Sequence, residues 1–296
     1  MSEKRRKIFN PLSKTKVTLM KVYNIGLIGR GKMGKAFQGE IEKSNKFNLV
    51  KIFSKRDIRK KKQNIRKFFR SNIFDLIIIT SPVDSHYQYL NYAMKNKKHI
   101  IVEKPLVENF NELKKLSKLN RNFKQKIMIH HNDILNFEKY KIFKKGYKNS
   151  KKIEMIYGKK DIKNSTKKPY FDWLPHPLAL IVKYFGFPKK FKILNYSKTK
   201  KESGLFEELK IEFSFKRLQI YLMFSNFLKN KTKKIFIFKN VKKEIYDGYK
   251  KKNRRSIKLL LEKFYKKNKI NEISLFFKSY DLLFRIKKDI ERRKIN

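Results

Sequence analysis

VYNIGLIGRGKMG, residues 22–34, begins as an apolar strand and ends in a glycine-rich turn. Gly29, Gly31 and Gly34 have the spacing GxGxxG, and a segment of helical character, 32–44, follows them. At this spacing the first glycine permits a tight turn, the second lets a pyrophosphate approach the backbone, and the third lets the helix pack closely on the strand. The helix N-terminus adds free amide groups. The segment predicts dinucleotide binding, with a purely structural glycine turn as the alternative.

Strand-like and helical segments alternate through the rest of the first half of the chain. Short apolar runs typical of buried strands are 48–54, 75–80, 99–103 and 126–131. Segments of helical character lie between them, at 58–69, 85–96 and 110–120. This alternation predicts a parallel sheet with helices on both faces, a doubly wound α/β fold. We assign residues 20–131 to a dinucleotide-binding Rossmann domain.

The pattern changes after residue 131. Strand-like segments now follow one another without helices between them, at 191–196, 206–215, 218–226 and 234–239, after an earlier one at 153–158. Helical character is confined to 173–186, 256–267 and 274–290. Consecutive strands of this kind predict a mostly antiparallel open sheet. We expect residues 132–296 to form an α+β domain that binds substrate and offers a sheet face for a homo-oligomer.

The charge of the chain is extreme, yet composition explains it. Of the 296 residues 78 are basic and the net charge is +53, but 64 of the basic residues are Lys and only 14 are Arg. The lysines are spread over the whole sequence, whereas a nucleic-acid site is clustered and rich in Arg. We therefore expect composition bias and no specific nucleic-acid partner. The alternative is a non-catalytic basic Rossmann protein that binds nucleic acid or another polyanion.

The sequence predicts neither a membrane span nor an N-terminal secretory signal. No stretch has the ~20 uncharged apolar residues of a membrane span, and residues 1–19 are basic without the apolar region of a secretory signal. We expect no membrane contact and a cytoplasmic protein. Residues 1–19 are expected to be a disordered tail, or to precede a true start at Met20. The absence of cysteine excludes disulfides and thiolate chemistry.

The end of the second predicted strand bears on the choice of cofactor. An acidic residue at that place binds the ribose 2′-hydroxyl of NAD. Here the sequence reads Ser54-Lys55-Arg56, a hydroxyl followed by two cations that suit a 2′-phosphate. NADP(H) is therefore favoured over NAD(H). The alternative is that Lys55 and Arg56 belong to the Lys-rich background.

A second cluster of polar residues follows two other predicted strands. Thr80 ends the run DLIIIT. Glu103 ends the run HIIVE and is followed by Lys104 and Pro105. Carboxyl ends of parallel strands share one edge of the sheet, where open α/β sheets bind ligands. The residues expected to bind cofactor at the turn, the second strand and this edge are Gly29, Arg30, Gly31, Lys32, Met33, Gly34, Ser54, Lys55, Arg56, Thr80, Ser81, Pro82, His86, Glu103 and Lys104.

These motifs together resemble the Gfo/Idh/MocA oxidoreductases, the glucose–fructose oxidoreductase and inositol dehydrogenase family. The resemblance rests on the glycine turn, on Thr80 to His86 and above all on Glu103-Lys104-Pro105. It implies that Lys104 lies beside the nicotinamide and contacts the reacting hydroxyl. It also implies a second-domain motif of Asp followed four residues later by His, which Asp172 and His176 fit. Two family features are missing, because Ala179 stands where members often carry Asp, and His130-His131-Asn132-Asp133 replaces an Arg-Phe pair.

The chemistry of alcohol oxidation assigns roles to these residues. Loss of hydride to a nicotinamide must be accompanied by loss of a proton to a base. His176 is the candidate base, and Lys104 is the donor that stabilises charge on the reacting oxygen. Asp172 could orient the imidazole or bind a neighbouring hydroxyl. No His or acidic spacing demands a metal site.

The resemblance implies a sugar or nucleotide sugar as substrate. Tyr170 and Trp173 could pack against a sugar ring, or they could be core residues. A bilin-type NADPH reductase is the alternative within the same fold, because Ser54-Lys55-Arg56 resembles the corresponding segment there.

Overall fold

The computed structural model describes most of the chain. The described residues are 21–54, 65–140, 150–158, 173–201, 204–239, 241–249 and 256–293. Four residues that the sequence singles out lie outside them, namely Lys55, Arg56, Tyr170 and Asp172, as does the expected tail, 1–19.

The first sheet has five parallel strands in the order β2-β1-β3-β4-β5. The strands are β1 (Tyr23–Ile28), β2 (Phe47–Phe53), β3 (Leu76–Ile79), β4 (His99–Glu103) and β5 (Ile127–His130), and the helices between them are α1 (Lys32–Ile41), α3 (Ile65–Arg70), α4 (His86–Lys95) and α5 (Phe110–Asn120). Every residue of β3 and β5 is buried, as expected for strands covered on both faces. The predicted Rossmann sheet is confirmed. Its strand order reverses at β1 and β3, the place where such sheets bind ligands.

The second sheet has six strands in the order β11-β10-β6-β9-β8-β7. They are β6 (Lys152–Gly158), β7 (Lys190–Lys201), β8 (Gly204–Ser214), β9 (Gln219–Ser225), β10 (Thr232–Phe238) and β11 (Lys242–Asp247). β6 and β9 pair in parallel, and every other pair is antiparallel. The predicted mostly antiparallel sheet is confirmed, although the sequence did not predict β11. Association of two copies through this sheet stays a prediction.

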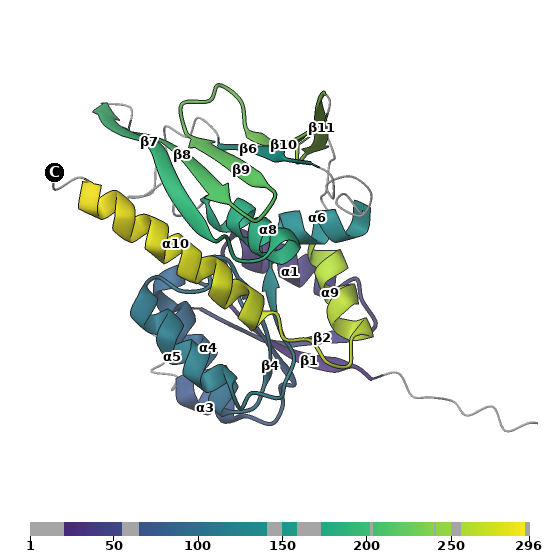
Figure 1. Ribbon diagram of the computed structural model, residues 1–296. Helices are drawn as coiled ribbons and strands as arrows, with labels where there is room; N and C mark the ends of the chain where they lie inside the picture. The colour runs from purple at the N-terminus through teal and green to yellow at the C-terminus, as the bar shows by residue number, and fades with distance from the viewer. Residues whose placement is uncertain are drawn as a thin grey trace, which may run out of the picture.

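Two helices connect the sheets through a common core. α6 (Asn132–Tyr140) follows β5 directly, and α8 (Pro175–Phe185) lies under the second sheet (Figure 1). The first eight residues of α8 are all buried, because the helix packs on the second sheet and on the C-terminal helix. The sequence predicted α8 but not α6.

The C-terminal part of the chain returns to the first sheet. α9 (Ser256–Lys266) shares a hydrophobic cluster with β1 and α1, and α10 (Ile273–Arg293) runs across α5 and α8 (Figure 1). Between these helices the backbone of Ile127 in β5 donates to Ile270 O at 2.9 Å and accepts from Glu272 N at 3.1 Å. The domain boundary expected at 131/132 stays a prediction, since α9 and α10 pack on both parts. Among the described residues no helix is long and apolar enough to cross a membrane.

Candidate active site

A cleft of about 710 Å³ opens at the carboxyl ends of β3, β4 and β5. It is bounded on the first-sheet side by residues that the sequence singled out and on the other side by α8 and β10. The residues lining it are Lys32, Met33, Thr80, Ser81, Pro82, Val83, His86, Glu103, Lys104, Pro105, His130, Asn132, Trp173, His176, Lys231, Lys233 and Tyr249. The two predicted catalytic residues that the structure describes, Lys104 and His176, therefore face one cavity.

The glycine turn has the geometry that phosphate binding requires. Gly29 has φ +110°, and a Cβ there would lie 2.8 Å from the Thr80 carbonyl. A Cβ on Gly34 would lie 2.1 Å from Gly29 O, so the helix packs against the turn only without a side chain. A Cβ on Gly31 would meet nothing within 4 Å among the described residues. Gly31 is also the N-cap of α1, and no described side chain caps it, so the first amides of the helix are open to an anion.

These observations fit a dinucleotide at the turn. Gly29, Gly31 and Gly34 would hold the pyrophosphate against the N-terminus of α1, with Lys32 beside it. Ser54 follows β2 directly and lies next to the turn, since Gly29 N donates to Phe53 O at 2.8 Å. Ser54, Arg30 and the three glycines do not line the cleft itself.

Two glycine variants separate the roles of the turn. Gly34→Ala should lower the melting temperature, because its Cβ would overlap a backbone oxygen. Gly31→Ala should leave the melting temperature unchanged and weaken NADPH binding by about tenfold, since its Cβ would occupy the space of the pyrophosphate. Thermal denaturation and calorimetric titration measure the two effects. A Gly31→Ala protein with unchanged NADPH affinity would contradict the placement.

His86 joins the two loops that bring Lys104 to the cleft. Its ring nitrogens lie 2.7 Å from Ser81 O and 2.7 Å from Pro105 O. Burial lowers the pKa of His86, against the effect of these carbonyls, and so favours the neutral ring. A neutral ring donates to only one of the two oxygens. Both nitrogens face backbone, so this His fixes the loop after β3 against the turn that carries Lys104.

Glu103 is tied to the neighbouring strand. Its Oε1 lies 2.5 Å from His130 Nδ1, and His130 Nε2 lies 3.2 Å from Ser256 Oγ at the start of α9. Glu103 and His130 are 8% and 3% exposed, so solvent has little access to this pair. The pair fixes the ends of β4 and β5, between which Lys104 leaves the sheet.

His176 lies in the first turn of α8 and is 8% exposed. Burial, together with Lys233 and Lys104, holds the pKa of His176 well below its usual range. The ring is therefore neutral at neutral pH and can accept a proton. Its Nδ1 lies 3.4 Å from Asp133 Oδ2.

Sequence reasoning missed the carboxylate beside His176. Asp133 stands in the first turn of α6, directly after β5, and is 2% exposed. Its position after a buried parallel strand is a signal that could have found it. Lys233, whose Nζ lies 3.2 Å from both Asp133 oxygens, had no such signal among 64 lysines. Asp172, the predicted orienting residue, lies outside the described residues.

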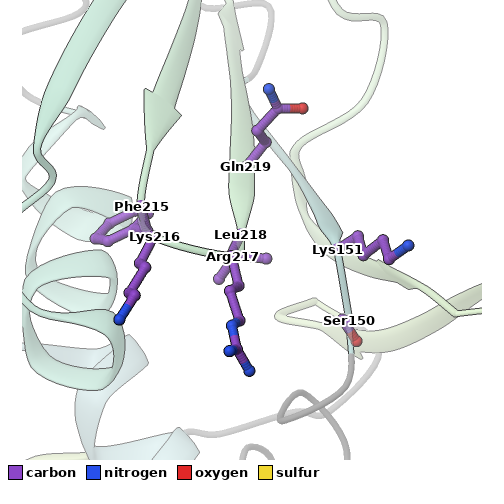
Figure 2. A pocket seen from close by; sticks show the side chains of 7 residues that line it. All are labelled: Ser150, Lys151, Phe215, Lys216, Arg217, Leu218 and Gln219. Carbon is purple, nitrogen blue, oxygen red and sulfur yellow. The ribbon is translucent and has the colours of Figure 1, made fainter.

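A second hollow, of about 590 Å³, lies at the turn between β8 and β9. Figure 2 shows that Lys216 and Arg217 both extend downward from the turn while Lys151 extends sideways, away from them. The charged ends do not converge on one point. Among the described residues no group of three or more His, Asp or Glu could hold a metal ion.

Comparison with known proteins places the first domain in a family. Residues 23–131 match the profile of Gfo/Idh/MocA, described as oxidoreductase family, NAD-binding Rossmann fold. A stretch of 117 residues is 25% identical to the uncharacterized oxidoreductase YdgJ of Escherichia coli and covers 36% of this chain and 34% of that protein. The resemblance is thus confirmed for this part of the chain. Residues 23–131 form a Gfo/Idh/MocA NAD-binding Rossmann domain.

Solved structures share the whole fold. The UDP-N-acetylglucosamine 3-dehydrogenase GnnA from Acidithiobacillus ferrooxidans superposes with a TM-score of 0.71 at 13% identity, over 90% of this chain and 97% of that one. Biliverdin reductase from Synechocystis sp. PCC 6803, solved with biliverdin and NADP⁺, superposes with a TM-score of 0.65 at 11% identity, over 88% and 96%. At these identities the likeness concerns the fold alone.

Proposed function

We propose that the protein is an NAD(P)-dependent oxidoreductase that transfers hydride between a nicotinamide and a secondary hydroxyl or keto group of a sugar or nucleotide sugar. One observation carries the proposal: Lys104 from the first sheet and His176 from α8 line the same cleft. They are far apart in sequence, and only the folded cleft brings them together. The adjoining glycine turn supports the cofactor side of the proposal.

The polar side chains at the cleft have separate roles in the proposed alcohol oxidation. A bound nicotinamide supplies the hydride acceptor. Lys104 donates a hydrogen bond to the reacting oxygen and stabilises negative charge on it. His176, neutral because burial lowers its pKa, accepts the hydroxyl proton and returns it in the reverse direction. Asp133 lies on the far side of the imidazole and stabilises the imidazolium that forms.

The substrate class rests on weaker support than the cofactor. GnnA, by its name, is a dehydrogenase of a nucleotide sugar, and its fold is similar. Trp173 lines the cleft and offers an aromatic face for a sugar ring. A bilin remains the second candidate, because biliverdin reductase has the same fold.

A substrate panel tests the proposal. Purified protein is incubated with NAD⁺ or NADP⁺ and with aldoses, inositols, sugar acids and UDP-sugars, and with NADPH and biliverdin in a separate series. Reduction of the nicotinamide by a polyol-type substrate supports the proposal. Turnover of biliverdin alone selects the bilin alternative, and binding of DNA at physiological salt without any turnover selects the non-catalytic one.

Cofactor preference gives a further prediction. If Ser54, Lys55 and Arg56 hold a 2′-phosphate, NADP(H) should bind at least ~10-fold more tightly than NAD(H), a difference of about 1.4 kcal/mol. Ser54→Asp should reverse the preference, because a carboxylate repels the phosphate and accepts from the ribose hydroxyl. Calorimetric titration with both cofactors measures it. Equal affinities in the wild-type protein would contradict the prediction.

A further inference from the structure

We propose that Asp133 and Lys233 form a positioning pair that fixes the tautomer of His176 and sets the charge around it. The inference rests on the proposed function for its catalytic meaning, but its geometry stands apart from it. Neither residue belongs to the motifs that the sequence matched. The three side chains come from three elements, α6, α8 and β10. His176 and Lys233 line the cleft, and Asp133 lies within 3.4 Å of His176 Nδ1 and 3.2 Å of Lys233 Nζ.

Asp133 is a buried carboxylate whose oxygens are held by donors. Lys233 Nζ lies 3.2 Å from both oxygens, and Tyr246 donates its hydroxyl to Oδ1 at 3.3 Å. Burial, as the largest cause, and Asp133 together raise the pKa of the Tyr157 hydroxyl. A buried carboxylate needs this compensation, since an unpaired charge is costly away from water. The position of Asp133 is thus fixed from several sides.

His176 presents one nitrogen to that carboxylate. Its Nδ1 is buried, lies 3.4 Å from Asp133 Oδ2, and makes no hydrogen bond with the described residues. A carboxylate only accepts hydrogen bonds, so it favours the tautomer that carries the proton on Nδ1. Nε2 then has its lone pair free for a substrate hydroxyl. The tautomer is the one that a general base in this cleft requires.

The described charged and titratable groups that act on His176 come from several elements around it. They are Asp133 on α6, Lys233 on β10, Lys104 after β4, and His130 and His131 at the end of β5. Alone, Asp133 would favour the imidazolium before any substrate binds. Lys233 offsets that effect, because it neutralises the carboxylate and itself lowers the pKa of His176. The pair therefore orients the ring without charging it.

Imidazole nitrogen NMR of the full chain, without cofactor or substrate, tests the tautomer directly. The chain has five histidines, so single His variants assign the signals. In wild type near neutral pH, His176 should show protonated Nδ1 and unprotonated Nε2. In Asp133→Asn, the single amide oxygen should turn to Lys233 and Tyr246, and the amide NH₂ should face Nδ1. The proton should then move to Nε2.

Glu138→Gln is the matched control for Asp133→Asn. It makes the same chemical change on the same helix and breaks ion pairs with Lys183 and Lys263, yet it does not face His176. In Glu138→Gln, the nitrogen chemical shifts of His176 should equal those of the wild-type protein. Identical His176 shifts in wild type and Asp133→Asn would overturn the proposal, and so would equal changes in both variants.

Lys233→Gln tests how the positive charge of Lys233 affects His176. Removal of the cation should raise the pKa of His176 towards its usual value while the Nδ1–H tautomer is kept, whereas Lys234→Gln on the same strand should change neither. If the pKa of His176 is unchanged or lower in Lys233→Gln, the proposed effect of the Lys233 charge is overturned.

In turnover, Asp133→Asn should lower kcat by about 10²-fold or more with little change in KM. If the His176 nitrogen shifts follow these predictions but no substrate is turned over in any assay, the proposed function is refuted and the positioning pair still holds.

Discussion

Lys104→Ala and His176→Ala should each lower the turnover number by about 10²–10⁴-fold, the range for a lost acid–base or oxyanion group. Both side chains line the cleft beside the glycine turn, and His176, whose pKa burial lowers, is the proposed base there. NADPH affinity should barely change, because neither residue belongs to the turn that we expect to hold the phosphates. Steady-state kinetics with the best substrate of the panel, and calorimetry for the cofactor, measure the two effects.

Matched variants keep this prediction specific. Lys118→Ala removes an exposed lysine from α5 and should leave turnover unchanged. His176→Asn keeps a polar side chain at the buried position and should still lose turnover, which separates chemistry from packing. Asp172→Asn should cost less than either Ala variant if that residue only orients the ring. Turnover within a factor of a few of wild type in Lys104→Ala would refute the shared-site mechanism.

Acidification should destabilise the protein strongly between about pH 6.5 and pH 4. Burial, as the largest cause, lowers the pKa of His131 to about 4 and that of His176 well below its usual value. In the unfolded chain both rings take up a proton near pH 6.5, so the unfolded state binds more protons throughout this window. Stability therefore falls as the pH falls. His131 alone accounts for a loss of about 3 kcal/mol over the window.

The bond from Ile134 N adds to burial in favouring the neutral form of His131, whereas the Pro175 carbonyl raises its pKa. Its Nε2 lies 3.2 Å from Pro175 O and donates to it, while its Nδ1 accepts from Ile134 N at 3.3 Å. A second proton on Nδ1 would face the Ile134 N–H and lose that bond. The ring also lies 4.9 Å from that of His176, measured between centroids. Once one ring is protonated, its charge therefore opposes protonation of the other.

His131→Gln isolates this contribution. A Gln amide can donate to Pro175 O and accept from Ile134 N, but it does not titrate. Urea unfolding at about pH 7 and about pH 5 should show a smaller loss of stability in the variant than in wild type. His99→Gln tests a second ring, since burial and two lysines also lower the pKa of His99 to about 4. Equal losses in wild type and His131→Gln would contradict the assignment.

The sequence predicts the parts of the site that depend on local spacing. The turn at Gly29, Gly31 and Gly34 follows from a strand, a glycine pattern and a helix in adjacent segments. Thr80 and Lys104 follow from their places at the ends of buried strands. These features can be predicted because backbone sterics and strand burial depend on residues that lie close together in the sequence.

Other parts depend on packing between distant segments, which no local pattern encodes. The sequence does not predict α6, because its first residues, Asn132 and Asp133, follow β5 after a single residue and belong to a segment that departs from the family pattern. β11 was missed because Lys242 and Lys243 at its start give no apolar alternation. The role proposed for Lys233 depends on its contact with Asp133 of α6, and a lysine in this composition carries no information by itself.

Fluorescence of the protein's single tryptophan tests most directly whether the nicotinamide lies in this cleft. Trp173 lines the cleft together with Lys104 and His176, and its emission overlaps the absorption of reduced nicotinamide. Titration with NADPH should quench Trp173 saturably and produce sensitised nicotinamide emission. Trp173→Phe should lose the sensitised emission while calorimetric NADPH binding persists, and Gly31→Ala should need more NADPH for the same quenching. An unchanged Trp173 spectrum at NADPH concentrations up to about 1 mM would contradict the account.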